Sequence, residues 1–223
     1  MMLDAGFTFI NEEFHAGSIL PQQLDLLLAD GWRHFGTHFF RYNLGFYEHD
    51  IRRVIPLRIR LADFLLSKSQ RRVLRKNDDL EIVIRPLAAD RESEHLFDRH
   101  KQRFKSDLPN SIYDFVAADV DSSPTEAMEL RVCENGKLCA VSYFDIAAAS
   151  VSGVYAMFEP SMSTRSLGIF TMLREIEFAA NSGKQFYYLG YTYEGNSFYD
   201  YKKRFSGNEM FDWSGSWVPF HDA

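Results

Sequence analysis

The spacing of apolar residues along the chain predicts an alternation of helices and strands. Recurrence every three to four positions predicts helices over residues 18–30, 67–77, 90–105, 111–118 and 168–182. Gly31 and Gly183 follow the first and the last of these as stop signals. Apolar runs predict strands over residues 32–42 (with a break at Gly36), 54–60, 80–86, 128–134, 137–147, 150–160, 184–195 and 211–220. Because it contains Pro56, the segment 54–60 is interpreted as an edge strand.

The pair Asn135-Gly136 separates two predicted strands and is typical of a two-residue hairpin turn. Such a turn places Cys133 opposite Leu138, and Cys139 opposite Val132. Because neighbouring positions of a strand alternate faces, the two cysteines are predicted on opposite sides of the sheet. We therefore expect neither a disulfide between them nor a shared metal ion, and we interpret both as small buried residues.

From about residue 80 the predicted order is strand, helices, hairpin, strand, helix, strand, short helix or turn, and strand. An antiparallel meander followed by a β-α-β crossover gives an α/β (α+β) fold with a mixed sheet. This order suits the GNAT-like acyltransferase fold. We expect that domain at residues 67–223, preceded by a small N-terminal α+β lobe at residues 1–66.

Composition narrows the class of protein. The chain has 223 residues, of which 46% are hydrophobic and 25% charged, as in ordinary globular proteins. No uncharged apolar run approaches the roughly 18–20 residues that cross a bilayer, and the N-terminus lacks the basic region of a signal peptide. We therefore expect a cytoplasmic protein with no membrane partner. The net charge of −6 is a mild argument against general nucleic-acid binding.

One stretch departs from this acidity. Residues 52–76 carry many arginines and lysines, and Asp63 is their only acid. Lys68, Arg72 and Lys76 recur at i, i+4 spacing and give the predicted helix a broad cationic face. The pattern is typical of a phosphate-binding surface, and equally of a solvated helix face that is paired with acids elsewhere.

The start of the helix at 168–182 is a candidate anion site. Free N–H groups at a helix N-terminus attract anions, and Arg165 adds positive charge. A GNAT-type turn for acetyl-CoA would read Gln/Arg-x-x-Gly-x-Gly/Ala. Arg165 and Gly168 match it, but the bulky Phe170 replaces the small residue. The turn therefore predicts an anion site that suits CoA poorly.

Strand 184–195 and the basic, aromatic segment after it form a third candidate. Strict alternation puts Tyr188 and Gly190 on one face and Tyr187 and Tyr191 on the other. Gly190 indicates close approach by a ligand or another backbone. The alternative interpretation is a packed aromatic strand followed by a solvated basic turn.

Two sets of residues resemble the arginyl-tRNA–protein transferase family, including its bacterial leucyl-transferring branch. The first set, Ser-x-Ser-Gln-Arg-Arg and Lys-Asn-x-Asp-Leu, is matched at Ser67, Ser69, Gln70, Arg71, Arg72, Lys76, Asn77, Asp79 and Leu80. The second set, Ser-Leu-Gly, Tyr-Leu-Gly-Tyr, Tyr-Lys and Phe, is matched at residues 166–168, 188–191, 201–202 and 205. Weaker matches at Leu20-Pro21, Gly31, Pro56 and Arg58 extend the resemblance over most of the chain.

The chain departs from the family at several positions. Gly17, Glu48, Ile51 and Val54 stand where the family has cysteines, so the resemblance implies no thiolate metal or cluster site here. Phe198-Tyr199 replaces Lys-Met, and Phe205-Ser206-Gly207 replaces Phe-x-Pro. His34 and His38 have i, i+4 spacing, but their strand-like context does not favour a metal pair. These departures indicate a divergent member.

The resemblance implies transfer of an arginyl or leucyl group from aminoacyl-tRNA, as co-substrate, to an amine. The acceptor would be a protein N-terminus (an N-degron), a peptide or a small molecule, and no tightly bound cofactor is implied. The expected catalytic residues are Glu159, Tyr191, Glu194, Tyr201 and Lys202. The expected substrate- and tRNA-binding residues are Lys68, Gln70, Arg71, Arg72, Lys76, Arg165, Ser166, Gly168, Tyr188, Gly190 and Arg204. Each carboxylate is equally consistent with a surface acid.

Two other functions stay open at this level. The first is a CoA-dependent GNAT N-acyltransferase, which Phe170 disfavours. The second is a non-catalytic relative that binds tRNA or a peptide. The donor amino acid, the acceptor and the oligomeric state are not determined by the sequence.

Overall fold

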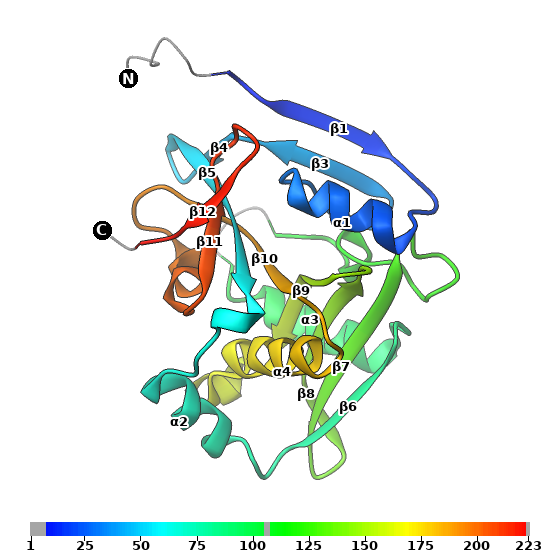
Figure 1. Cartoon of the computed structure of the whole chain (residues 1–223). Helices are drawn as coiled ribbons and strands as arrows, with labels where there is room; N and C mark the ends of the chain where they lie inside the picture. Colours follow the sequence, from blue (N-terminus) through cyan, green and yellow to red (C-terminus); the bar gives the residue numbers. More distant parts are fainter. Residues whose placement is uncertain (1–7, 105–107, 222–223) are drawn as a thin grey trace.

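The computed structural model describes residues 8–104 and 108–221 and is built around a nine-stranded mixed sheet (Figure 1). Its strands run in the order β12-β11-β5-β10-β9-β8-β7-β6, and β4 also pairs with β5. These strands are β4 (Leu44–Tyr47), β5 (Asp50–Arg60), β6 (Glu81–Pro86), β7 (Glu126–Glu134), β8 (Lys137–Ile146), β9 (Ser150–Phe158), β10 (Phe186–Tyr193), β11 (Asn208–Phe211) and β12 (Trp217–Pro219).

The part of the sheet from β6 to β10 has the predicted order. Strands β6 to β9 form an antiparallel meander, and α4 (Leu167–Asn181) then crosses over to β10, which is parallel to β9. The turn between β7 and β8 has positive φ at Asn135 and Gly136, as a two-residue hairpin turn requires. The α+β class and the GNAT-like order are therefore confirmed.

Helices cover the sheet on both sides (Figure 1). On one side α4 packs on β7 to β10 through a core that includes Leu130, Phe144, Phe170 and Leu189. On the other side α3 (Arg91–Lys101) packs on β8 and β9 with Leu96 and Phe97 fully buried. The alternation of strand side chains supplies an apolar surface to each side.

A smaller antiparallel sheet, in the order β1-β3-β2, lies beside α1 (Pro21–Ala29). Its strands are β1 (Asn11–His15), β2 (Arg33–Phe35) and β3 (His38–Tyr42). Leu24 and Leu28 of α1 pack with Phe39 of β3 and with Tyr188 of the large sheet. The lobe boundary at residue 66 stays a prediction, and β5 within that range pairs with β10 and β11.

Three predicted elements differ from the structure. The strand predicted at residues 211–220 is instead the end of β11, a loop at residues 212–216 and β12, which folds back antiparallel to β11. Strand β5 is not at an edge, because β10 pairs with one side of it and β4 and β11 with the other. Pro56 is tolerated because it lies between the residues of β5 that pair with β4 and those that pair with β11, so no partner on this side of the ladder needs an N–H from residue 56. The helix predicted at 111–118 is only a 3₁₀ turn, η2 (Ile112–Asp114), since Ser111 and Asp114 cap so short a segment.

The two cysteines lie on opposite sides of the sheet, as predicted, but Cys133 is only half-buried. Cys133 pairs with Leu138, but Val132 pairs with Ala140, because the ladder has an irregularity beside Cys133. Cys139 is buried in the core under α4, whereas Cys133 packs against the core on the α3 side. Both thiols are free.

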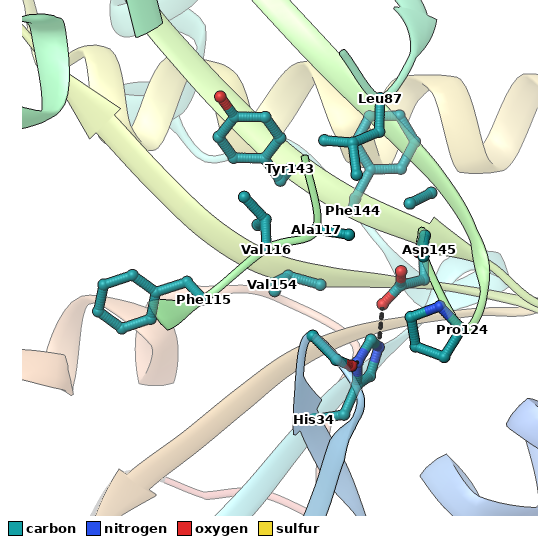
Figure 2. Close-up of a pocket in the computed structure, with 13 residues that line it drawn as sticks. His34, Leu87, Phe115, Val116, Ala117, Pro124, Tyr143, Phe144, Asp145 and Val154 are labelled. Carbon is teal, nitrogen blue, oxygen red and sulfur yellow. Dashed lines mark hydrogen bonds and ion pairs between the residues drawn. The ribbon is translucent and has the colours of Figure 1, made fainter. Parts of the chain in front are cut away.

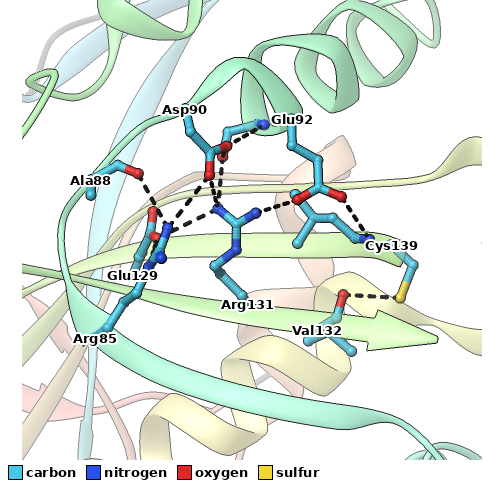
Figure 3. A network of polar contacts seen from close by, with 10 residues as sticks. Arg85, Ala88, Asp90, Glu92, Glu129, Arg131, Val132 and Cys139 are labelled. Atoms are coloured by element: carbon cyan, nitrogen blue, oxygen red, sulfur yellow. Dashed lines mark hydrogen bonds and ion pairs between the residues drawn. The ribbon is translucent and has the colours of Figure 1, made fainter. Parts of the chain in front are cut away.

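A network of ion pairs connects the start of α3 to β6 and β7 (Figure 3). Arg131 on β7 donates to Asp90 at 3.0 Å and to Glu92 at 2.7 Å. Glu129, which is completely buried, accepts from Arg85. Burial raises the pKa of Glu129 despite the two nearby guanidinium groups. The network orients α3 on the sheet.

The small sheet is joined to the large one by a buried ion pair (Figure 2). His34 Nε2 on β2 lies 2.7 Å from Asp145 Oδ2 on β8, and Thr125 Oγ1 donates to the other carboxylate oxygen at 2.6 Å. Burial by itself lowers the pKa of His34, but the charge and hydrogen bond of Asp145 outweigh it, so this pKa is raised.

This pair predicts a pH-dependent stability. A histidine whose folded pKa is raised stabilises the fold fully below its unfolded pKa of about 6.5, and the contribution is lost as pH rises through the folded pKa. The Tm difference between wild type and Asp145→Asn is therefore expected to be largest near pH 5.5 and to shrink towards pH 8.5. Thermal unfolding across this range measures it. Glu177→Gln, at an exposed ion pair, is the control, and a difference that grows with pH would contradict the assignment.

Candidate active site

A cleft opens where β9 and β10 separate. The two strands pair only between residues 150–152 and 186–188, and beyond these positions they diverge. The cleft between them has about 390 Å³ of empty space, its open mouth included. Its lining residues are Tyr143, Gly153, Val154, Tyr155, Ala156, Gly168, Thr171, Met172, Glu175, Tyr187, Leu189, Tyr201 and Lys202.

Glu175 and Tyr187 form a buried acid pair at one wall of the cleft. Tyr187 Oη on β10 donates to Glu175 Oε2 on α4 at 2.5 Å. Burial raises the pKa of Glu175 to about 7 and outweighs the hydrogen bonds that favour its charged form. Gly153 lies against this pair, since a Cβ at that position would stand 2.6 Å from Tyr187 Oη. The Glu175 carboxyl is therefore partly protonated at pH 7, and the shape of this wall depends on Gly153.

Two cations lie close together beside the cleft, and one of them, Lys202, lines it. Lys202 lies on the 3₁₀ segment η4 (Phe198–Arg204), and its Nζ donates to the Tyr191 carbonyl at 3.0 Å. Arg33 of β2 donates to Ser152 Oγ at 2.6 Å and also to the Gly153 carbonyl. Burial lowers the pKa of Lys202 from 10.5 to about 7, with a further contribution from the charge of Arg33. Lys202 is therefore poised to gain or lose a proton near neutral pH.

Gly190 makes room for these cations. Its φ of +83° and the irregular register beside it mark a bulge in β10. A Cβ on Gly190 would stand 3.3 Å from Lys202 Nζ and 3.5 Å from an Arg33 nitrogen. The close approach expected at Gly190 is therefore made by two side chains.

The bulge also corrects one prediction. Tyr191 does not share a side with Tyr187, because the irregularity interrupts the alternation of β10. Tyr191 Oη donates to the Gly31 carbonyl at 2.6 Å, and its ring contacts Phe40 and Tyr42 of β3 in the small sheet. Burial raises its pKa. Of the five expected catalytic residues, only Tyr201 and Lys202 line the cleft.

The two expected catalytic carboxylates lie elsewhere. Glu159 accepts from Arg99 at 2.7 Å and from Ser161 at 3.2 Å, and the net effect of its surroundings lowers its pKa. Glu194 is exposed in the loop after β10. Neither is among the cleft-lining residues. The carboxylate that does line the cleft is Glu175.

Two of the expected binding residues, Lys76 and Arg165, instead connect α2 (Lys68–Lys76) and the segment after it to the start of α4. Lys76 Nζ donates to the Thr164 carbonyl at 2.7 Å. Arg165 makes 2.8 Å contacts with both Asp79 and Glu134. The hydrogen bond from Arg165 lowers the pKa of Asp79. Asp79 and Glu134 thus pair with the positive charge of Arg165 beside the N-terminus of α4.

The remaining expected binding residues are distributed over three places. Gln70 is buried in the capping box of α2 with Ser67, and Arg71 donates to the Leu66 carbonyl. Ser166 adopts φ +56° at the start of α4, and Tyr188 accepts a hydrogen bond from Arg58. Lys68 and Arg72 on α2 and Arg204 on η4 are exposed, and within the described part of the chain no ion pair is found for them.

Sequence reasoning did not identify Glu175, Tyr187 or Arg33 as site residues. Glu175 had a usable signal, because it falls four residues after Thr171 and four before Ala179 on the buried face of α4. A carboxylate in that stripe is unusual unless it is paired. Arg33 had no local signal, since its partners lie about 120 residues away in the sequence.

The cleft lies between two parallel strands of a GNAT-like sheet and is lined by a lysine with a lowered pKa and a buried carboxylate. This arrangement indicates a group-transferring enzyme. The family model for the C terminus of arginine-tRNA-protein transferase matches residues 92–212. The chain belongs to this family of transferases. Among curated relatives, the aspartate/glutamate leucyltransferase of Xanthomonas euvesicatoria is 34% identical over 76% of this chain and 71% of its own length. That of Campylobacter jejuni is 30% identical over 82% and 77%, respectively.

Solved structures with a similar arrangement are more distant. The C-terminal domain of a putative lysylphosphatidylglycerol synthetase from Agrobacterium fabrum is 14% identical with a TM-score of 0.49, and the match covers 83% of this chain and 55% of that one. FemX is 11% identical with a TM-score of 0.49, over 78% and 61%. This chain therefore spans little more than half of each of those two proteins.

Two features are absent from the described residues. In that part of the chain no group of three His, Cys, Asp or Glu side chains is placed to hold a metal ion. None of its helices is long and apolar enough to cross a membrane.

Proposed function

We propose that this protein transfers a leucyl group from aminoacyl-tRNA to the N-terminal amine of a protein or peptide. The observation that carries the proposal is the cleft between β9 and β10, with Lys202 on one wall and the Glu175–Tyr187 pair on the other. The curated relatives, which are named aspartate/glutamate leucyltransferases, support the same reaction. A donor of this kind also implies a cytoplasmic location.

The lining of the cleft favours a leucyl over an arginyl donor. Val154, Met172 and Leu189 supply apolar surface on three sides. Glu175 is the only carboxylate among the lining residues, and it is bound by Tyr187 with a pKa of about 7. An arginyl side chain needs a free carboxylate, because burying an unpaired guanidinium is costly. An apolar side chain needs none.

The chemistry needs one proton to move. The acceptor's neutral amine nitrogen attacks the ester carbonyl carbon, and a C–N bond forms. Neutral Lys202 takes the proton that the nitrogen loses. As the bond from carbon to the ribose oxygen breaks, the Lys202 ammonium gives this proton to that oxygen. The product is an amide and a free tRNA 3′ end, and Lys202 is unchanged.

CoA-dependent acyl transfer is not favoured. Asp79 and Glu134 lie beside the start of α4, where a pyrophosphate would bind in that reaction. Phe170 is fully buried in the core, so its bulk is not what obstructs the turn. The negative charges of Asp79 and Glu134, not the bulk of Phe170, would oppose a bound pyrophosphate.

The exposed face of α2 is proposed to bind tRNA phosphates. Lys68 and Arg72 lie one turn apart on this helix and are exposed. Each phosphate contact contributes about 0.9 to the slope of log K against log salt. Lys68→Ala and Arg72→Ala are therefore each expected to reduce the salt slope of tRNA binding by about one. Lys137→Ala, at the exposed end of the β7–β8 hairpin, is the control. An unchanged salt slope in both variants would exclude this face of α2 as a tRNA-binding surface.

The proposed function is tested by transfer of labelled amino acids. Purified protein is mixed with tRNA charged with labelled leucine, or with labelled arginine in parallel, and with peptides that begin with Asp, Glu or Ala. Leucine in an RNase-resistant peptide is the expected result. Transfer of arginine alone would overturn the donor assignment. Binding of charged tRNA without transfer to any peptide would indicate a non-catalytic relative.

A further inference from the structure

A continuous run of aromatic rings and guanidinium groups extends outwards from the cleft. It consists of Tyr47, Arg52, Arg103, Phe198 and Tyr199, which we call the aromatic–guanidinium surface. Three separate segments contribute to it: the β4–β5 hairpin, the turn after α3, and η4. Phe198-Tyr199 is also the position at which this chain replaces the Lys-Met of the motif discussed above.

The contacts within this surface are close. The Tyr47 and Tyr199 rings lie 6.5 Å apart, and those of Phe198 and Tyr199 lie 5.6 Å apart. The Arg52 guanidinium lies over Tyr47 at 4.8 Å, and that of Arg103 lies over Phe198 at 5.6 Å. Aromatic and arginine planes of this kind are the groups on which unpaired nucleotide bases stack.

The surface is accessible. Phe198 is 56% exposed and Tyr199 is 36% exposed, unusually high values for large aromatic side chains. The surface also carries two arginines, although Arg52 has Asp50 at 3.9 Å and donates to the Asn196 carbonyl. Exposed rings beside arginines favour an anionic, planar ligand over an apolar protein segment.

The surface is connected to the cleft. Lys202, which lines the cleft, has its Nζ 5.1 Å from the centre of the Tyr199 ring. Tyr155 of β9 also lines the cleft, and the charges of Arg103 and Tyr199 act on its pKa. Its hydroxyl is buried, and none of the described residues hydrogen-bonds to it. The Tyr199 ring therefore adjoins the cleft through Lys202.

We propose that the aromatic–guanidinium surface stacks the unpaired 3′-terminal nucleotides of the donor tRNA. The inference rests on the proposed function, because an aminoacyl ester held in the cleft brings its own unpaired nucleotides to the cleft mouth. Phe198 and Tyr199 supply the stacking faces, and Arg52 and Arg103 bind the phosphates between the bases. The basic face of α2 contacts the duplex part of the same tRNA.

The test compares two uncharged RNA hairpins with the same acceptor stem, one with four unpaired 3′ nucleotides and one blunt-ended. Fluorescence anisotropy at fixed salt gives both affinities. Wild type is expected to bind the tailed hairpin about tenfold more tightly. Phe198→Ala and Tyr199→Ala are expected to lose most of this preference while blunt-end binding is unchanged. Retained blunt-end binding also shows that these variants fold.

Matched variants make the result specific. Phe198→Tyr and Tyr199→Phe keep a ring and are expected to keep the preference for the tail. Tyr113→Ala removes a tyrosine that is 43% exposed and lies outside the surface, and it is expected to have no effect. The proposal is overturned if wild type shows no preference for the tailed hairpin. It is also overturned if the alanine variants keep this preference and instead raise KM for the acceptor peptide.

The outcomes separate this inference from the proposed function. If wild type transfers amino acids but shows no preference for the tail, the proposed role of the aromatic–guanidinium surface is overturned and the proposed function is not. A ring-dependent tail preference without transfer would support the surface and overturn the function. Neither transfer nor RNA binding would overturn both.

Discussion

Lys202→Met is expected to lower kcat/KM for amino-acid transfer by about 10²-fold or more, which is the usual contribution of a positioned proton acceptor. The physical reason is the environment of Lys202 Nζ, where burial and the charge of Arg33 lower the pKa to about 7. At pH 8 most of the amine is neutral and can accept a proton, and methionine cannot do so. Steady-state transfer kinetics from pH 6 to pH 9 measure the effect.

The pH profile separates this role from a structural one. The wild-type rate is expected to rise with two ionisations, that of Lys202 near pH 7 and that of the acceptor α-amine at about pH 8. Only the first rise is expected to be absent in Lys202→Met. Methionine fills similar space and removes a buried amine, so Tm is expected to be unchanged or higher. Lys137→Met is the control for loss of a lysine. A folded Lys202→Met protein with the wild-type rate would exclude Lys202 as the proton acceptor.

Gly153→Ala is expected to lower the free energy of unfolding by about 1–3 kcal/mol, as overpacking of a buried site does. The new methyl group would stand 2.6 Å from Tyr187 Oη and 3.2 Å from Glu175 Oε2. Because the Tyr187 side chain is rigid and fully buried, β9, α4 or both have to move. The same movement widens or tilts the cleft wall, so transfer is expected to fall at least tenfold.

A double-mutant cycle tests the cause. In a Tyr187→Phe background the hydroxyl is absent, so the added cost of Gly153→Ala is expected to be smaller than in wild type. Chemical denaturation of the four proteins measures this coupling, and transfer assays give the catalytic part. Gly17→Ala, where no atom lies within 4 Å of the new Cβ, is the control. Strict additivity of the two changes would show that the steric contact does not carry the effect.

Local sequence signals determined much of the fold. Ser67 and Gln70 cap α2 as their spacing predicts, and Asn135-Gly136 forms the hairpin turn. The order of elements from β6 to β10 follows from periodicity and length alone. These signals act over a few residues, so each is contained in its own segment of the chain.

The family also was determined by the sequence, but the roles of its motif residues were not. The motif lysine and arginine, Lys76 and Arg165, were expected to bind phosphate, whereas the structure pairs them with the Thr164 carbonyl and with Asp79 and Glu134. A charged residue binds the nearest available partner. Here the partner is set by the packing of α2 against the start of α4, not by local sequence.

The cleft itself was decided by tertiary structure. Its chemistry depends on Arg33 reaching Ser152, on the bulge at Gly190, and on Glu175 meeting Tyr187. Each of these contacts joins different elements, and the first spans 119 residues of sequence. The pKa of Lys202 follows from that assembly, because burial and the charge of Arg33 exist only in the folded state. The sequence by itself determined the elements and the family, and the three-dimensional packing selected which residues face the cleft.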